Sequence, residues 1–265
     1  MRKRPPKAKR FPWRSMFVFF LVIFAVTFFL SASFAPLARL ATAPPAQNQA
    51  GTLEKLTQNY PRVYQIFAIK KAVAAKLNKK NYVKSADISP ELKNAVVAME
   101  DNRFYTHYGF DPVGIIRAAL VNLQKGSFVE GGSTITQQLA KNLFLSREKS
   151  YFRKAEELIL AIDLEQNFSK DEILEIYLNT IYFGAGAYGV AEASSLYFAK
   201  LPVALSLAES ALLAGVVNAP SVNSPLVNLP AAKERQRLVL EAMVKHGYIS
   251  LADAKEARDA PVKLR

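Results

Sequence analysis

Helix start signals recur from residue 89 onward, and they limit the fold of this chain more than any other feature. Ser89-Pro90-Glu91 combines a capping serine, a proline at the first helical position and an acid in the first turn. Other starts of this kind lie at Asp111-Pro112, Ser169, Ser206 and Pro230. Residues 89–259 show no sustained strand alternation. The sequence therefore predicts one mainly α-helical domain over residues 52–265.

A second feature is the uncharged apolar stretch of residues 15–38. At about 1.5 Å per residue, a helix of this length crosses a hydrocarbon core of about 30 Å. Residues 1–14 hold seven basic residues and no acid, which predicts a cytoplasmic tail and an extracytoplasmic domain. We expect a single-pass anchor in the plasma membrane, followed by a linker over residues 39–51. A cleaved signal peptide is the alternative, but its best cleavage site, Ala41-Thr42-Ala43, is followed by Pro44.

Composition narrows the chemistry. The formal net charge is +13, and +6 remains when the basic tail is set aside. An extracytoplasmic domain argues against a nucleic-acid partner and favours an anionic membrane or a phosphate-bearing substrate. The chain has no cysteine, which excludes disulfides and thiolate catalysis, and its two histidines lie far apart in the sequence.

Residues 53–80 read as helical with a break at Pro61 and many lysines among apolar positions. Two interpretations are open for this segment. It is either a helix that packs on the domain or a basic amphipathic segment that lies near the membrane surface.

The glycine pair Gly131-Gly132 leads directly into a helix that Ser133 or Thr134 can cap. A helix start presents unpaired N–H groups and a partial positive charge, and both suit an anion. Donor side chains follow within two turns, at Gln137, Gln138, Lys141 and Asn142. The alternative is an ordinary capped helix with a polar face. No Gly-Lys-Ser/Thr follows, so this is not a nucleotide P-loop.

Glu100 lies at the end of an apolar helix, beside the aromatic residues Phe104 and Tyr105. Partial desolvation there would raise the pKa of its carboxyl group and suit a proton acceptor. The alternative is a pair of solvated acids, Glu100 and Asp101, without a chemical role.

Arg153 and Glu157 are i, i+4 neighbours on a long predicted helix. They form either a surface ion pair or one wall of a cleft, where the small Ala161 leaves room. Five cations between residues 141 and 154 would suit a pyrophosphate group, namely Lys141, Arg147, Lys149, Arg153 and Lys154.

Four stretches, in order, resemble the signatures of the peptidoglycan glycosyltransferases, glycosyltransferase family 51. They are Glu100-Asp101-x-x-Phe104-x-x-His107-x-Gly109, Gly132-Ser133-Thr134-Ile135-Thr136-Gln137-Gln138-x-x-Lys141-Asn142, Arg153-Lys154-x-x-Glu157-x-x-x-Ala161 and Lys170-x-x-Ile173-Leu174-x-x-Tyr177-Leu178-Asn179. The similarity covers roughly residues 82–250. It implies a lysozyme-like, two-lobed helical fold and a hexosyltransferase activity.

The resemblance implies that lipid II is polymerised into glycan strands with inversion and release of undecaprenyl pyrophosphate. Glu100 would then be the base, and Glu157 the second carboxylate near the donor's pyrophosphate. The pyrophosphate-binding and substrate-binding residues would be Lys141, Arg153, Lys149, Arg117, Ser133, Thr134, Gln137, Gln138, Asn142 and His107. No organic cofactor is implied, and a divalent cation such as Mg²⁺ or Mn²⁺ near Glu157 is left open. Partners would be lipid II, the nascent glycan, the membrane and other cell-wall synthesis proteins.

The family's segment between the first two signatures dips partly into the membrane. Apolar residues there fit either that role or a buried core, namely Ile115, Ile116, Leu120, Val121 and Leu123. About 45 residues after Pro220 leave no room for a transpeptidase, so we expect a monofunctional enzyme. The alternatives are a truncated bifunctional class A penicillin-binding protein, a lytic hydrolase on the same fold and a non-catalytic scaffold.

Overall fold

The computed structural model describes residues 68–127, 131–145 and 151–265. All of them belong to Tyr60–Arg265, the second of two compact units of the chain. The predicted tail, membrane helix and linker, and the first part of the 53–80 helix, lie outside the described residues. Within the described ranges, no helix has both the length and the hydropathy needed to span a membrane.

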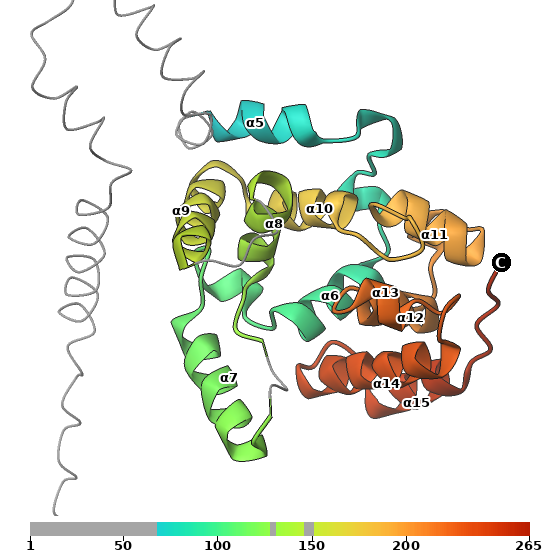
Figure 1. Cartoon of the computed structure of the whole chain (residues 1–265). Coiled ribbons are helices and arrows are strands. Elements are labelled where there is room, and N and C mark those ends of the chain that lie inside the picture. Colours follow the sequence, from blue (N-terminus) through green and yellow to red (C-terminus); the bar gives the residue numbers. More distant parts are fainter. Residues whose placement is uncertain (1–67, 128–130, 146–150) are drawn as a thin grey trace, which may run out of the picture. The chain divides into compact units, whose positions relative to one another are not determined.

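The described body is helical, which confirms the predicted class (Figure 1). Its only β-pairing in the described ranges is two isolated bridges, Tyr108 with Phe110 and Tyr182 with Tyr188. The α-helices are α5 (Ile69–Lys76), α6 (Pro90–Glu100), α7 (Pro112–Lys125), α8 (Ile135–Phe144), α9 (Tyr151–Asn167), α10 (Lys170–Thr180), α11 (Val190–Phe198), α12 (Leu207–Val216), α13 (Pro220–Asn223), α14 (Leu229–Lys245) and α15 (Leu251–Asp259). Short 3₁₀ turns, η2 (Lys79–Asn81), η3 (Ser85–Asp87), η4 (Phe104–Thr106) and η5 (Pro202–Ala204), lie between them.

The structure confirms the predicted caps, which depend only on residues close to one another in the sequence. Ser89 accepts a hydrogen bond from the Leu92 N–H at the start of α6, and Asp111 caps α7 in the same manner. Ser169 and Ser206 each form the reciprocal capping box at the starts of α10 and α12. The predicted helix at Pro230 begins one residue earlier, at Leu229, since Asn228 provides its cap.

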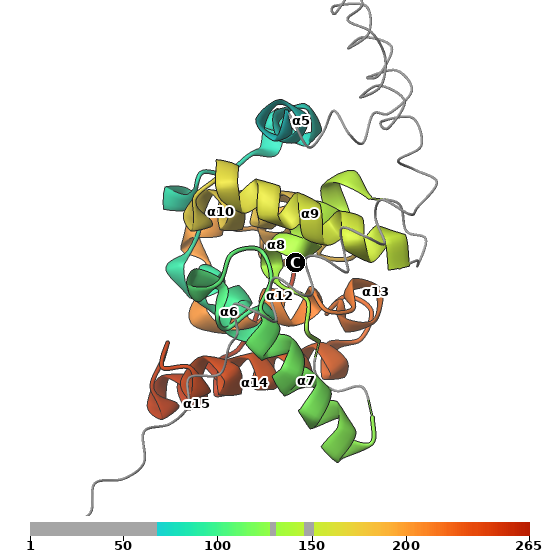
Figure 2. The same ribbon diagram turned by 90° about the vertical axis from the view of Figure 1, so that its left-hand side faces the viewer.

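Helix α12 lies at the centre of the packing, and every residue from Ala208 to Val216 is buried. It contacts α6 and α14, while α8 contacts α9 and α10. Figures 1 and 2 show α8, α9 and α10 on one side, α14 and α15 on the other, and α6 and α12 between them. Buried apolar residues of both groups form one continuous core, with Leu92, Leu139, Tyr177, Leu212 and Leu240 among them.

Helix α5 supports the packed interpretation of the segment that contains it. Ile69 and Val73 are buried in the main core, although the helix ends at Lys76 and not at the expected Lys80. The part of residues 53–80 before residue 68 lies outside the described residues.

Helix α7 behaves differently, since only its small residues Gly114 and Ala118 are buried. Most of its large apolar side chains are exposed, namely Val113, Ile115, Ile116, Leu120 and Leu123. The buried-core interpretation of this segment is therefore wrong for those residues.

Candidate active site

Glu100 is the last residue of α6, and its side chain is partly buried. Its Oε2 accepts a hydrogen bond of 2.9 Å from the Nε2 of Gln138 on α8. Burial raises the pKa of Glu100, while the Gln138 hydrogen bond and the charges of Arg235 and Lys141 act in the lowering direction. The predicted desolvation of this carboxylate is confirmed, and its pKa lies above the ordinary value.

Two cations from different helices act on this carboxylate. Lys141 lies one turn beyond Gln138 on α8 and is exposed, and Arg235 comes from α14. The Nε and Nη2 atoms of Arg235 are buried and have no hydrogen-bond partner among the described residues. Guanidinium donors in that state are available to an anionic ligand.

The sequence interpretation did not identify Arg235. It lies on α14 near Glu234 and Arg237, which form an ordinary exposed ion pair. A Cβ at Gly215 would lie 3.0 Å from the Cβ of Arg235, so this glycine on α12 leaves room for the arginine. A lone glycine inside a helical pattern was the one available signal.

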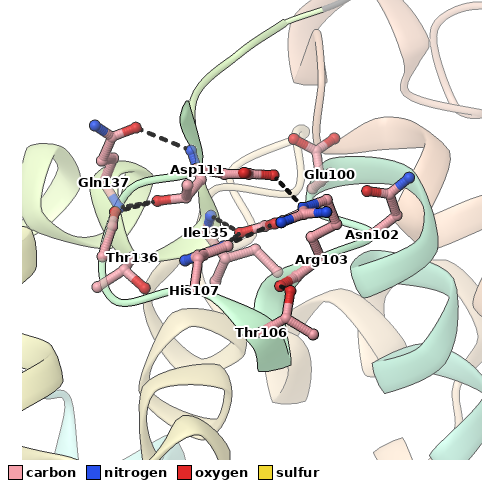
Figure 3. A network of polar contacts seen from close by, with 12 residues as sticks. Glu100, Asn102, Arg103, Thr106, His107, Asp111, Ile135, Thr136 and Gln137 are labelled. Carbon is pink, nitrogen blue, oxygen red and sulfur yellow. Dashed lines mark hydrogen bonds and ion pairs between the residues drawn. The ribbon is translucent and has the colours of Figure 1, made fainter. Parts of the chain in front are cut away.

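Asp101 connects the end of α6 to the start of α8. Its two carboxylate oxygens each lie 3.0 Å from the Nε2 of His107, and Oδ2 also accepts a 3.0 Å hydrogen bond from the Ile135 N–H. Beside this pair, Arg103 and Asp111 form an ion pair of 2.9 Å. Figure 3 shows Glu100 next to this network, which holds the loop between α6 and α7. His107 is buried within it, and its predicted role toward the substrate stays a prediction.

The start of α8 is already occupied by protein groups. Thr134 is the cap, and its side chain and that of Gln137 form a capping box, which satisfies the N–H groups of both residues. The Ile135 N–H is bonded to Asp101. The expectation of unpaired N–H groups for an anion is therefore wrong for these three residues. Thr134 and Gln137 are buried, and their predicted part in substrate binding stays a prediction.

Glu157 on α9 is 3% exposed, so the surface ion-pair interpretation is wrong. Its Oε2 accepts from Arg153 Nη1 at 3.2 Å, and its Oε1 pairs with Lys154, which also reaches the Oγ of Ser133 at 3.1 Å. The backbone of Ala161 lies against Gly109, since a Cβ added at Gly109 would be 3.0 Å from the Ala161 carbonyl group. Ala161 therefore does not line an open space at that point.

Both carboxylate oxygens of Glu157 are held by cations, so a divalent cation there would have to share them with Arg153 and Lys154. The described residues bring no group of three His, Asp or Glu side chains together as a metal site.

Three predicted substrate-binding residues, Arg117, Asn142 and Lys149, remain to be placed. Arg117 on α7 donates to the Asn102 Oδ1 at 3.3 Å, and the Nδ2 of Asn102 lies 3.0 Å from the Nε2 of His246. Asn142 is exposed on α8 next to Lys141. Lys149 lies outside the described residues.

Comparisons with known proteins identify the family of this chain. The sequence model of the transglycosylase family matches residues 68–244. The chain belongs to this family. The resemblance stated from the four signatures is thereby confirmed.

The relatives differ in length, so the matched region covers most of one and about a quarter of others. A putative transglycosylase of Cupriavidus necator is 46% identical over 185 residues, which are 70% of this chain and 80% of that protein. Penicillin-binding protein 1A of Aquifex aeolicus is 48% identical over 189 residues, which are 71% of this chain and 26% of that protein. This chain thus spans about a quarter of the length of such penicillin-binding proteins. The crystal structure of penicillin-binding protein 1A from Haemophilus influenzae has a TM-score of 0.42 and 27% identity, over 69% of this chain and 18% of its own.

Proposed function

We propose that this protein is a peptidoglycan glycosyltransferase that polymerises lipid II into glycan strands with inversion at the anomeric carbon. The observation that carries the proposal is the carboxylate of Glu100, whose pKa is raised by burial and which lies within reach of the charges of Lys141 and Arg235. A base, and positive charges that act on it, suit a reaction in which a hydroxyl attacks and a diphosphate departs. Family membership supplies the sugar-transfer class.

In the proposed reaction, the 4-hydroxyl of the incoming lipid II sugar attacks the anomeric carbon of the growing chain. The new bond joins that oxygen to the anomeric carbon, and the bond from the anomeric carbon to the diphosphate oxygen breaks. The hydroxyl proton passes to Glu100, whose raised pKa suits a base near neutral pH. Undecaprenyl pyrophosphate leaves with the electron pair.

Cations at this site would stabilise the departing charge, and such groups are most effective where they are held in place before the reaction begins. The charges of Lys141 and Arg235 both act on Glu100. The resemblance adds Arg153 and Lys149 to the cations that would bind the diphosphate. Glu157 would hold Arg153 and Lys154 in place beside Ser133. A divalent cation such as Mg²⁺ or Mn²⁺ near Glu157, which the resemblance leaves open, stays a prediction.

The remaining proposals concern the membrane and the shape of the domain. Residues 15–38 would anchor the enzyme, and the exposed apolar side chains of α7 would contact the outer surface of the same bilayer. A lipid-linked substrate explains why both features would be useful. The two groups of contacting helices, α8–α10 and α6 with α12 and α14, are consistent with a lysozyme-like domain of two lobes.

The test uses the full chain in detergent with lipid II and follows glycan formation. Glu100→Gln should fold and bind substrate but lose roughly 10²–10⁴-fold in kcat, the usual contribution of a general base. Glu241→Gln, which changes an exposed glutamate on α14, is the matched control and should keep full activity. Polymerisation by Glu100→Gln at the wild-type rate would contradict the proposal. Soluble muropeptides in place of new glycan would identify a hydrolase.

A further inference from the structure

A chain of three side chains leads from the core to the carboxylate of Glu100. The hydroxyl of Tyr177, on α10, donates to the Oε1 of Gln138 at 2.9 Å. The Nε2 of Gln138, on α8, donates to the Oε2 of Glu100 at 2.9 Å. Three helices therefore contribute one residue each to a continuous hydrogen-bonded path.

We infer that Tyr177 is a positioning residue for Glu100, which it controls by fixing the amide of Gln138. The inference rests on the proposed function, in which Glu100 is the base. An amide has one end that accepts and one that donates, and only the donating end can stabilise a carboxylate. Because the Tyr177 hydroxyl holds the oxygen end, the NH₂ end is directed at Glu100.

Burial makes this device rigid. Tyr177 is fully buried within the core, so its ring cannot move without disturbing its neighbours. Burial, and the nearby charges of Glu100 and Asp101, raise the pKa of Tyr177 well above its ordinary value. The hydroxyl therefore keeps its proton throughout any useful assay range.

Without the hydroxyl, the oxygen of Gln138 loses its donor, and the amide is free to turn or move away. Glu100 then loses a donor that favours its ionised form, so its pKa rises. The other groups that face it, Asp101 from the end of α6, Lys141 from α8 and Arg235 from α14, stay in place. We expect a loss specific to the base, without a loss of substrate binding.

The test measures kcat and kcat/KM for lipid II polymerisation across pH with the full chain in detergent. Tyr177→Phe should move the acidic limb of the profile upward by about one pH unit, since a hydrogen bond to a charged group is worth roughly that much. Below the limb this is about a tenfold loss of rate, and KM should not change. Tyr197→Phe is the matched control, because Tyr197 is equally buried and its hydroxyl donates to the Phe183 carbonyl instead.

Two further measurements keep the inference testable. In a Gln138→Met background, Tyr177→Phe should add no further shift, because the path is already interrupted. The pKa of Glu100 can also be read from ¹³C-labelled glutamate, with Glu100→Gln identifying its signal, and it should rise in Tyr177→Phe. This readout needs no turnover, so it separates failure of the inference from failure of the proposed function. An unchanged pKa in folded Tyr177→Phe, or an equal shift in Tyr197→Phe, would overturn the inference.

Discussion

Replacement of Asp101 by alanine tests whether this residue joins α6 to α8. Its side chain is 4% exposed and accepts from two buried donors, the Nε2 of His107 and the Ile135 N–H. Alanine would leave both donors without a partner, at about 1–3 kcal/mol each. Loss of a negative charge at the start of α8 adds about 0.3–1 kcal/mol. The total is roughly 2–7 kcal/mol of unfolding free energy, summed from these contributions.

For a body of this size, each kcal/mol lowers Tm by about 2–4 °C, so we expect a decrease of roughly 4–28 °C. The measurement is thermal unfolding of the full chain in detergent by circular dichroism. Asp253→Ala is the control, because this exposed aspartate also accepts from a backbone N–H at a helix start, that of the capping residue Ser250. Its cost should be only about 0.5–1 kcal/mol. Equal Tm values for the two variants would refute the connecting role of Asp101.

Three other perturbations have definite signs. Gly189→Ala should destabilise strongly in a Tm measurement, because φ is +81° and the new Cβ would lie 2.6 Å from the carbonyl oxygen of Asn179; a wild-type Tm would contradict this close contact. Burial acts to raise the pKa of Glu209, but hydrogen bonds, chiefly from Lys200, leave this pKa lowered. The ionised carboxylate therefore stabilises the fold, and Glu209→Gln should reduce Tm at pH 7. The difference in Tm should vanish as pH falls below about 4.5. The opposite holds for Glu100, whose pKa is raised. Its contribution to stability is present below about pH 4.5 and is lost as pH rises. Glu100→Gln should therefore raise Tm at pH 7 but not at pH 4. A pH-independent difference for either variant would show that the cause is packing and not ionisation.

The parts of the fold that could be predicted from the sequence are those that depend on neighbours in the chain. A cap such as Ser169 and its partner Glu172 are three residues apart, so the start of α10 follows from local chemistry. The desolvation of Glu100 could also be predicted, because an acid at the end of an apolar helix has little access to water.

The parts that could not be predicted depend on distant segments. Asp101 meets Ile135 across 34 positions, and nothing in the pattern around the glycine pair shows that a carboxylate already occupies the helix start. The charge of Arg235 on α14 acts on Glu100, although the neighbouring charges on that helix suggest an ordinary solvated face. The exposure of α7 was also undetermined, since an apolar stripe shows which residues share a face but not what covers them.

The occupied start of α8 changes how this site would bind a diphosphate. A free helix start offers N–H groups and a partial positive charge, but Asp101 and the capping box use these groups within the protein. The diphosphate would then depend on side-chain cations, and two of these, Lys141 and Arg235, also favour the ionised form of Glu100. Arrival of a doubly negative leaving group would offset that effect and strengthen the base as the reaction begins. The same cations would thus connect substrate binding to the proton affinity of Glu100.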